Sequence, residues 1–154
     1  MAAMETHRAF DEIVWSVNPR NDTVKELAHG ICRYAEEFLA RSPIKIRISM
    51  QPNLPEIAME PSTRHSLFLA TKEAISNAFK HSGAEQLHLS ISFAGGVLEI
   101  LVSDNGKGFD PSLPSHRNGL KGMNERLIQI GGACSITCPP SHGTSVQFRF
   151  PIAP

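Results

Sequence analysis

The stretch LVSDNGKGF, residues 101–109, decides how this chain folds and what it binds. An apolar run ends there at Asp104 and is followed at once by two glycines. A strand that leaves the core and turns sharply would place the Asp104 carboxylate at the mouth of a pocket. Because Gly106 and Gly108 lack Cβ atoms, we expect a ligand to approach the backbone closely at this turn. Taken alone the pattern is weak, since Asp-Asn-Gly is also an ordinary turn sequence.

A second segment, KEAISNAFKHSG at residues 72–83, lies upstream and has helical spacing of its polar residues. Glu73 and Asn77 are four residues apart, and Lys80 and His81 follow Asn77 at three and four residues. On a helix these positions share one face. The segment therefore predicts a helix with a stripe of four chemically active side chains.

A third segment, NGLKGMNER at residues 118–126, lies downstream and contains two more glycines. Gly119 and Gly122 come just before an apolar pattern of helical period that begins at Met123. We expect a glycine-rich loop that leads into a helix over 123–130. Such a loop would present free backbone N–H groups and a helix N-terminus to a phosphate.

The three segments resemble, in chain order, the N box and the first and second glycine boxes of one ATPase superfamily. That superfamily comprises gyrase, Hsp90, histidine kinases and MutL, and its nucleotide site is often called the Bergerat fold. The KHS that follows the N-box Asn77 and the GLKGMNER of the second glycine box are similar to sensor histidine kinases paired with NarL-type response regulators. The resemblance covers residues 44–150, which is most of the chain.

The resemblance implies an ATP site. Its matching aspartate, Asp104, accepts a hydrogen bond from the exocyclic amine of adenine, and Thr144 supports the base through its hydroxyl. For Thr144, an ordinary strand threonine is nearly as good an interpretation. The nucleotide-binding residues expected from the two glycine boxes are Gly106, Gly108, Gly119, Leu120, Gly122 and Met123.

The resemblance also implies a Mg²⁺ ion, with Asn77 as its protein ligand. Magnesium prefers oxygen ligands and keeps several waters, so one amide oxygen suits it. Lys80 and His81 would donate to phosphate oxygens, although a solvated helix end is a competing interpretation for each. Glu73 would orient a magnesium-bound water, or act as a weak base as it does in hydrolysing relatives.

Kinase function also requires a phospho-accepting histidine, which this family places in a basic helix directly before Asp or Glu. His7 is followed by Arg8 and His29 by Gly30, so neither matches. We therefore expect the catalytic half of a larger protein, inactive in transfer without its missing acceptor. The implied partners are ATP, the dimerisation and phospho-acceptor domain of the parent kinase, and a NarL-type response regulator.

Composition fits a single domain of a cytoplasmic protein. The 154 residues include 15 Lys plus Arg and 15 Asp plus Glu, so nothing indicates a nucleic-acid or acidic-membrane surface. No apolar run reaches the roughly 20 residues of a membrane span. Parent kinases are often membrane-bound, with this part on the cytoplasmic side. Three cysteines fit a reducing compartment, and Cys134 and Cys138 favour ordinary thiols over a zinc site.

The predicted fold is α+β, a two-layer sandwich with helices on one face of a mixed, mainly antiparallel sheet. Residues 1–20, with a helix over 5–17, are interpreted as the remnant of a dimerisation helix and its linker, and 21–154 as the ATPase domain. A further helix is expected over 24–40, before the N-box helix that begins at Pro61. The expected strands are 44–49, 87–93, 97–103, 134–138 and 144–150, with apolar residues alternating over 87–93.

Short signals mark the ends of these elements. Asn21-Asp22-Thr23 offers caps for the helix over 24–40, and Gly131-Gly132 would end the helix over 123–130. Gly95-Gly96 predicts a hairpin turn between two strands, and the last two strands are expected to turn around Pro139-Pro140.

Two alternatives remain open beside the kinase hypothesis. One is an autonomous switch of the same fold, driven by ATP hydrolysis at Glu73. The other is a nucleotide-binding module without transfer activity. Steady hydrolysis by the isolated chain would favour the first alternative. Transfer to a supplied acceptor domain would separate the kinase from the second.

Overall fold

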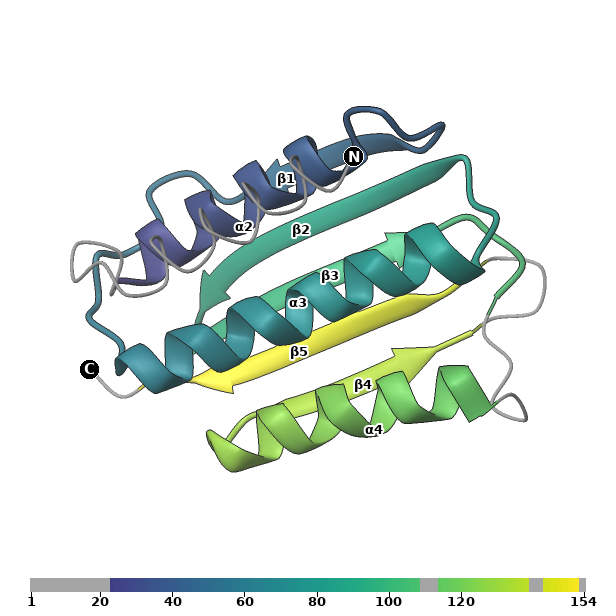
Figure 1. Ribbon diagram of the computed structural model, residues 1–154. Coiled ribbons are helices and arrows are strands. Elements are labelled where there is room, and N and C mark those ends of the chain that lie inside the picture. Colours follow the sequence, from purple (N-terminus) through teal and green to yellow (C-terminus); the bar gives the residue numbers. More distant parts are fainter. Residues whose placement is uncertain (1–22, 109–113, 139–142, 153–154) are drawn as a thin grey trace, which may run out of the picture.

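The computed structural model describes residues 23–108, 114–138 and 143–152, without the side chains of residues 81 and 114–118. The predicted helix over 5–17 and the turn at Pro139-Pro140 lie outside these residues. The elements follow in the order α2 (Val24–Leu39), β1 (Lys45–Met50), α3 (Pro61–His81), β2 (Gln86–Ala94), β3 (Val97–Asp104), α4 (Pro114–Gln129), β4 (Ala133–Thr137) and β5 (Ser145–Pro151). Figure 1 shows α2, α3 and α4 on one face of the sheet, which confirms the predicted α+β sandwich.

The sheet has five strands in the order β1-β2-β3-β5-β4. β1 pairs with β2 in parallel, and the other three pairs are antiparallel, so the sheet is mixed and mainly antiparallel as predicted. The parallel pair requires a crossover, which α3 supplies. Antiparallel pairing of β3 with β5 brings the end of β3 next to the start of β5, and this is where the site forms.

Local sequence signals begin and end these elements. The Thr23 hydroxyl caps α2 by accepting a hydrogen bond from the Glu26 N–H at 3.2 Å. Pro61 is the first residue of α3, where a missing N–H costs nothing. Gly131 has a φ of +85°, and the next N–H, of Gly132, donates to the Leu127 carbonyl at 2.7 Å, which ends α4 as predicted.

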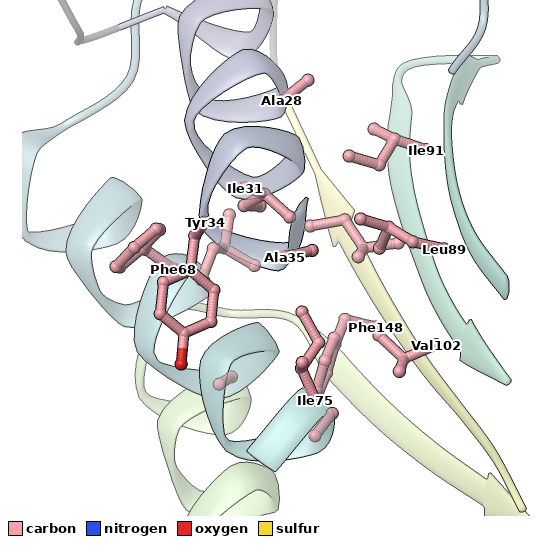
Figure 2. Close-up of a cluster of buried hydrophobic side chains, with 14 of the residues drawn as sticks. Ala28, Ile31, Tyr34, Ala35, Phe68, Ile75, Leu89, Ile91, Val102 and Phe148 are labelled. Carbon is pink, nitrogen blue, oxygen red and sulfur yellow. The ribbon is translucent and has the colours of Figure 1, made fainter. Parts of the chain in front are cut away.

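The core lies between the helices and the sheet (Figure 2). Alternate residues of the strands point into it, so Leu87, Leu89 and Ile91 of β2 are each at most 1% exposed. Ile31 of α2 and Ile75 of α3 meet them from the helical layer. Burial of each such side chain contributes about 1.5–3 kcal/mol, so apolar packing holds the helices on this face.

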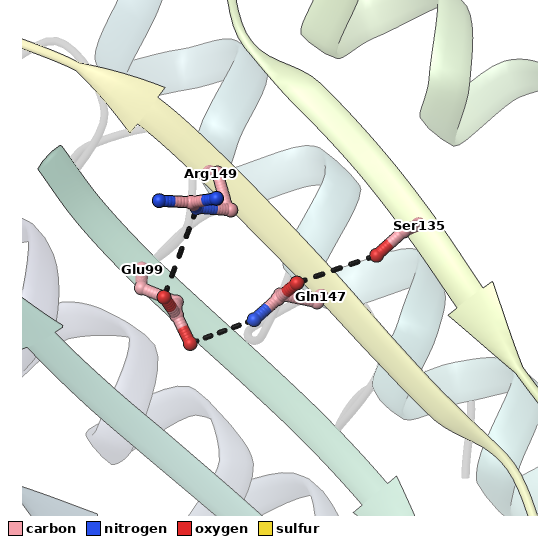
Figure 3. A network of polar contacts seen from close by, with 4 residues as sticks. All are labelled: Glu99, Ser135, Gln147 and Arg149. Carbon is pink, nitrogen blue, oxygen red and sulfur yellow. Dashed lines mark hydrogen bonds and ion pairs between the residues drawn. The ribbon is translucent and has the colours of Figure 1, made fainter.

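The opposite face of the sheet carries polar side chains (Figure 3). Glu99 accepts from Gln147 at 2.7 Å and lies 3.8 Å from the Arg149 guanidinium, while the Ser135 hydroxyl donates to Gln147 at 3.3 Å. The Glu99 and Arg149 side chains are 37% and 57% exposed, so water screens the pair and it contributes at most about 1 kcal/mol. This face is a solvated surface.

None of the helices in the described part of the chain combines the length and apolar character that crossing a membrane requires.

Candidate functional site

A pocket of about 490 Å³, counted with its open mouth, lies between α3, α4 and the ends of β3 and β5. Its walls are mainly apolar, because apolar side chains from five different elements converge on it. These wall residues are Ala74, Ala78, Val102, Met123, Ile136 and Val146. The predicted site residues Asn77, Asp104, Gly108, Leu120 and Thr144 also line the pocket, as does Met123.

Asp104 is the last residue of β3 and the buried acid of this pocket. Its side chain is only 8% exposed, and Oδ1 accepts the Gly106 N–H at 2.9 Å. Burial raises the pKa of the Asp104 carboxyl, while hydrogen bonds from the backbones of Gly106 and Thr144 counter this in part. The prediction that Asp104 stands at a pocket is confirmed.

The start of β5 holds Asp104 from the other side. The Asp104 N–H donates to the Thr144 carbonyl at 2.9 Å. A Cβ at Gly143 would overlap the Asp104 carbonyl oxygen and lie 2.9 Å from Oδ1, and the φ of Gly143 is +76°. Only glycine fits at this position, for both reasons. The Thr144 hydroxyl lies 3.5 Å from the Cys138 sulfur, at the pocket wall.

The two glycines after Asp104 have different roles. Gly108 lines the pocket with a φ of +88°, in agreement with a backbone that a ligand can approach. For Gly106 the structure shows a further requirement. A Cβ there would overlap the Ser82 carbonyl oxygen and lie 2.6 Å from the Ser82 Cβ, so the glycine is required by packing within the protein.

The N-box helix α3 presents Asn77 to the pocket and leaves Glu73 exposed beside it. Both face α4, because a Cβ at Gly119 would lie 2.9 Å from Asn77 Nδ2 and 3.3 Å from Glu73 Oε1. Lys80 is exposed near the end of the helix. The His81 side chain lies outside the described residues, so its predicted place on the polar stripe stays a prediction.

The predicted glycine-rich loop before Met123 is wrong, because α4 begins at Pro114 and contains Gly119 and Gly122. Proline suits a first helical position. Glycine costs about 1 kcal/mol inside a helix, but at Gly119 it permits close contact with α3, and burial of Met123 and Leu127 holds the helix on the core. Nothing lies within 4 Å of a Cβ at Gly122.

This arrangement fits a flat, mainly apolar group with a hydrogen-bond donor on its edge. Such a group would lie between the apolar walls and donate to Asp104, the one charged side chain among the described residues that line the pocket. Asn77 offers an amide oxygen on another wall of the same pocket, a ligand type that Mg²⁺ accepts. An adenine nucleotide with magnesium therefore fits the residues present.

Sequence reasoning missed several residues that build the site. Ser82 lines the pocket and packs against Gly106, and Gly143 holds Asp104. The only signal for Gly143 was a glycine directly before the expected Thr144. Val102 and Val146 were predicted as strand residues but not as pocket walls.

The cysteines are free thiols where the structure describes them. Burial raises the pKa of Cys32 and of Cys134 to about 11, so both are protonated at neutral pH. Within the described ranges, no cluster of three or more His, Cys, Asp or Glu side chains could hold a metal ion.

Residues 62–154 match the family described as histidine kinase-, DNA gyrase B-, and HSP90-like ATPase. Sensor histidine kinase LiaS of Bacillus subtilis (strain 168) is 31% identical over 131 residues, which cover 84% of this chain and 35% of LiaS. Sensor protein VraS of Staphylococcus aureus (strain COL) is 29% identical over 129 residues, which cover 83% of this chain and 36% of VraS. The chain thus spans about a third of the length of these relatives.

Solved structures share the fold. The histidine kinase domain of the Erythrobacter litoralis EL346 blue-light activated histidine kinase has a TM-score of 0.68 at 21% identity, covering 82% of this chain and 65% of that one. Full-length ShkA in complex with AMPPNP has a TM-score of 0.63 at 23% identity, covering 80% of this chain and 30% of ShkA. At such identities the likeness concerns the fold alone.

Proposed function

Because this chain belongs to the histidine kinase-, DNA gyrase B-, and HSP90-like ATPase family, we propose that it is the ATP-binding catalytic domain of a sensor histidine kinase. The observation that carries the proposal is the buried Asp104 carboxylate, which lines an otherwise mainly apolar pocket. A charged acceptor in apolar surroundings is costly to bury unless a donor pairs with it. The exocyclic amine of adenine is such a donor.

At the base end of the pocket, Asp104 accepts from the adenine amine and the Thr144 hydroxyl supports the base. The apolar walls exclude water from the ring. Since a missing partner would leave the Asp104 carboxylate buried without its donor, the site selects bases that carry an amine at this edge.

At the phosphate end, Asn77 holds magnesium through its amide oxygen, and Lys80 and His81 donate to phosphate oxygens. ATP supplies the transferable γ-phosphoryl group, and magnesium neutralises charge on the phosphates. Glu73 lies beside Asn77 and is exposed. Its proposed role is to orient a magnesium-bound water, and the exposed position gives no support for a strongly activated base.

In the parent protein, the phosphoryl group would pass to a histidine on a dimerisation domain. A NarL-type response regulator would follow downstream, and this domain would lie in the cytoplasm. Residues 1–20 would be the end of the dimerisation helix with its linker, and 21–154 the catalytic domain. The span of about a third of LiaS and VraS supports a domain within a longer kinase.

Calorimetry of Mg-ATP binding tests the proposal by comparing the unsubstituted chain, called the parent chain below, with the Asp104→Asn variant. The amide oxygen of the variant can keep the Gly106 hydrogen bond, while its NH₂ group replaces the second oxygen and opposes the adenine amine. We expect a loss of about 1–3 kcal/mol, the cost of breaking a charged hydrogen bond. That loss corresponds to roughly 5- to 150-fold weaker binding.

Glu99→Gln is the matched control, because it makes the same carboxylate-to-amide change on the solvated face of the sheet. It should leave ATP affinity unchanged. Failure of the parent chain to bind ATP, or equal binding by parent and Asp104→Asn, would contradict the proposed adenine contact.

Transfer is tested with Mg-ATP and the separately purified dimerisation domain of the parent kinase. Phosphate on the acceptor histidine is the expected result, and Asn77→Ala should abolish it. Steady ATP hydrolysis without an acceptor would instead favour an autonomous switch, and ATP binding with no transfer would favour a module without kinase activity.

A further inference from the structure

Asn105 directly follows the adenine-reading Asp104, yet its side chain bonds to a distant part of the chain. Its Oδ1 accepts the N–H groups of Glu85 and Gln86, both at 2.9 Å. Its own N–H donates to the Gln86 carbonyl at 3.2 Å. Three hydrogen bonds from one residue therefore hold the turn after β3 to the first residue of β2 and to the residue before it.

This pattern differs from that of an ordinary turn asparagine, which bonds to its own backbone two residues on. Here Asp104 makes that local bond, through Oδ1 and the Gly106 N–H. The Asn105 oxygen is instead used 19 and 20 residues upstream. A role in shaping the turn locally does not account for that.

The same turn is held a second time, at the end of α3. The Lys107 N–H donates to the Ser82 carbonyl at 2.8 Å, and Gly106 packs directly against Ser82. The Ser82 hydroxyl in turn accepts the Ala84 N–H at 3.0 Å, which shapes the connection from α3 into β2. The turn and this connection therefore form one hydrogen-bonded unit.

This unit joins the two halves of the pocket. Asp104 stands at one end of it, and Asn77 lies on α3 five residues before Ser82. A rigid unit sets the position of the base acceptor relative to the metal-binding oxygen. Binding a ligand that spans both groups depends on that spacing, because hydrogen bonds weaken steeply when donor and acceptor are displaced from their preferred distance and angle.

We propose that Asn105 is a positioning residue of the nucleotide site, which acts by tying the Asp104 turn to the connection between α3 and β2. The proposal rests on the proposed function, since it assumes that Asp104 and Asn77 bind one ligand. Asn105 itself is exposed and does not line the pocket. Its effect on binding would therefore be exerted entirely through Asp104 and Ser82.

The test compares Asn105→Ala with Asn105→Asp, which retains an acceptor oxygen of the same reach. Asn105→Ala should bind Mg-ATP about 5- to 10-fold more weakly, the effect of losing one or two modest hydrogen bonds. Asn105→Asp should restore most of the affinity. Asn53→Gly, at an exposed loop position whose φ of +59° glycine adopts readily, is the control for the loss of an asparagine side chain.

A nucleotide-free readout separates this proposal from the proposed function. In Asn105→Ala, NMR should show faster exchange of the Gln86 and Gly106 amide protons. It should also show a higher pKa of the Asp104 carboxyl, because the Gly106 N–H that favours its charged form is held less firmly. General destabilisation would lower the melting temperature without a selective change at Asp104.

Different outcomes test the proposed function and the role of Asn105. If the unsubstituted chain does not bind ATP, the proposed function fails, and the NMR readouts still test whether Asn105 holds the Asp104 turn in place. Unchanged amide exchange and an unchanged Asp104 pKa in Asn105→Ala would show that Asn105 does not hold the Asp104 turn to the connection between α3 and β2. Altered NMR readouts with unchanged ATP affinity, or failure of Asn105→Asp to recover affinity, would overturn the positioning role.

Discussion

The two ends of the pocket are built in different ways. At the base end, Asp104 is 8% exposed and is held by the backbones of Gly106 and Thr144, with Gly143 packed against it. At the phosphate end, Asn77 and the exposed Glu73 face a helix, α4, across the close contact at Gly119. The base end consists of paired strand ends, and the phosphate end lies between two helices.

The difference indicates which end of the pocket is fixed before a ligand binds and which end can change. Hydrogen-bonded strand ends in glycine-dependent contact leave little freedom, so the base end is complete before a ligand arrives. A helix that contains two glycines is intrinsically weak, so the phosphate end can change at modest cost. We expect substitutions that crowd the backbone contacts of the base end to affect folding strongly, and substitutions in α4 at the phosphate end to shift a small conformational balance.

The largest effect is expected for Gly143→Ala. The new Cβ would overlap the backbone of Asp104, and alanine would be forced to a φ of +76°. Together these should cost about 3 kcal/mol or more of the free energy of unfolding, which is a fall of roughly 10 °C in melting temperature. Thermal unfolding followed by circular dichroism measures it.

Gly95→Ala is the matched control, because its φ of +61° is similar and nothing lies within 4 Å of its Cβ. It should cost only about 1 kcal/mol. Equal losses in the two variants would show that the contact with Asp104 is not rigid, and that the base end is less constrained than its geometry indicates.

A pH series should produce an intermediate effect with opposite signs in folding and binding. Burial raises the pKa of Asp104, so the nucleotide-free chain binds this proton more tightly than the unfolded chain does. Its contribution to stability therefore falls as pH rises from the ordinary aspartate value through the raised value. ATP affinity should instead fall as the pH is lowered, by up to about tenfold per pH unit below the raised pKa of Asp104.

The measurement is calorimetric ATP affinity and denaturant unfolding for parent and Asp104→Asn across acidic to neutral pH. The difference between the two chains removes the titration of the ATP phosphates. The variant should match or exceed the parent in stability at neutral pH while binding ATP more weakly. Parallel pH curves for the two chains would mean that Asp104 does not titrate in this range.

The smallest effect is expected for Gly122→Ala in α4. The Cβ would enter open space, and replacing glycine within a helix stabilises it by up to about 1 kcal/mol. The melting temperature should rise by about 2–4 °C. We expect ATP affinity to fall by up to about fivefold, because a stiffer α4 would resist the change near Gly119 that we expect access to Asn77 to require.

Calorimetry and thermal unfolding on the same sample check this pair of changes. Gly119→Ala serves as the comparison, since its Cβ would press on Asn77 Nδ2 at 2.9 Å. A more stable Gly122→Ala chain with unchanged ATP affinity would show that α4 keeps its structure when nucleotide binds. The phosphate end would then be as rigid as the base end.

Signals that act over a few residues could be read before the structure was known. Gly95 and Gly96 both have positive φ in the hairpin between β2 and β3, as the repeated glycine predicts. The Thr23 cap, the Pro61 start and the alternation of residues 87–93 were read equally well. Each reflects steric or hydrogen-bonding preferences of the local chain, which neighbouring elements rarely overrule.

The site could be predicted only in part. Asp104 and Asn77 were found because their chemistry is visible as residue type and spacing. The loop around Gly119 and Gly122 was wrong, since glycine propensity favours a loop while packing of α4 on α3 and the core favours a helix. Propensities of about 1 kcal/mol per residue lose to the burial of large apolar side chains such as Met123.

The sequence by itself determined the elements apart from the first half of α4, their order and the presence of an acid at the end of a strand. Only the tertiary structure decided that β1 lies parallel to β2, that Gly143 meets Asp104 from 39 positions away, and that Asn105 bonds to Gln86. These are contacts between segments far apart in the chain. Their formation depends on which surfaces pack together, and no short stretch of sequence encodes that choice.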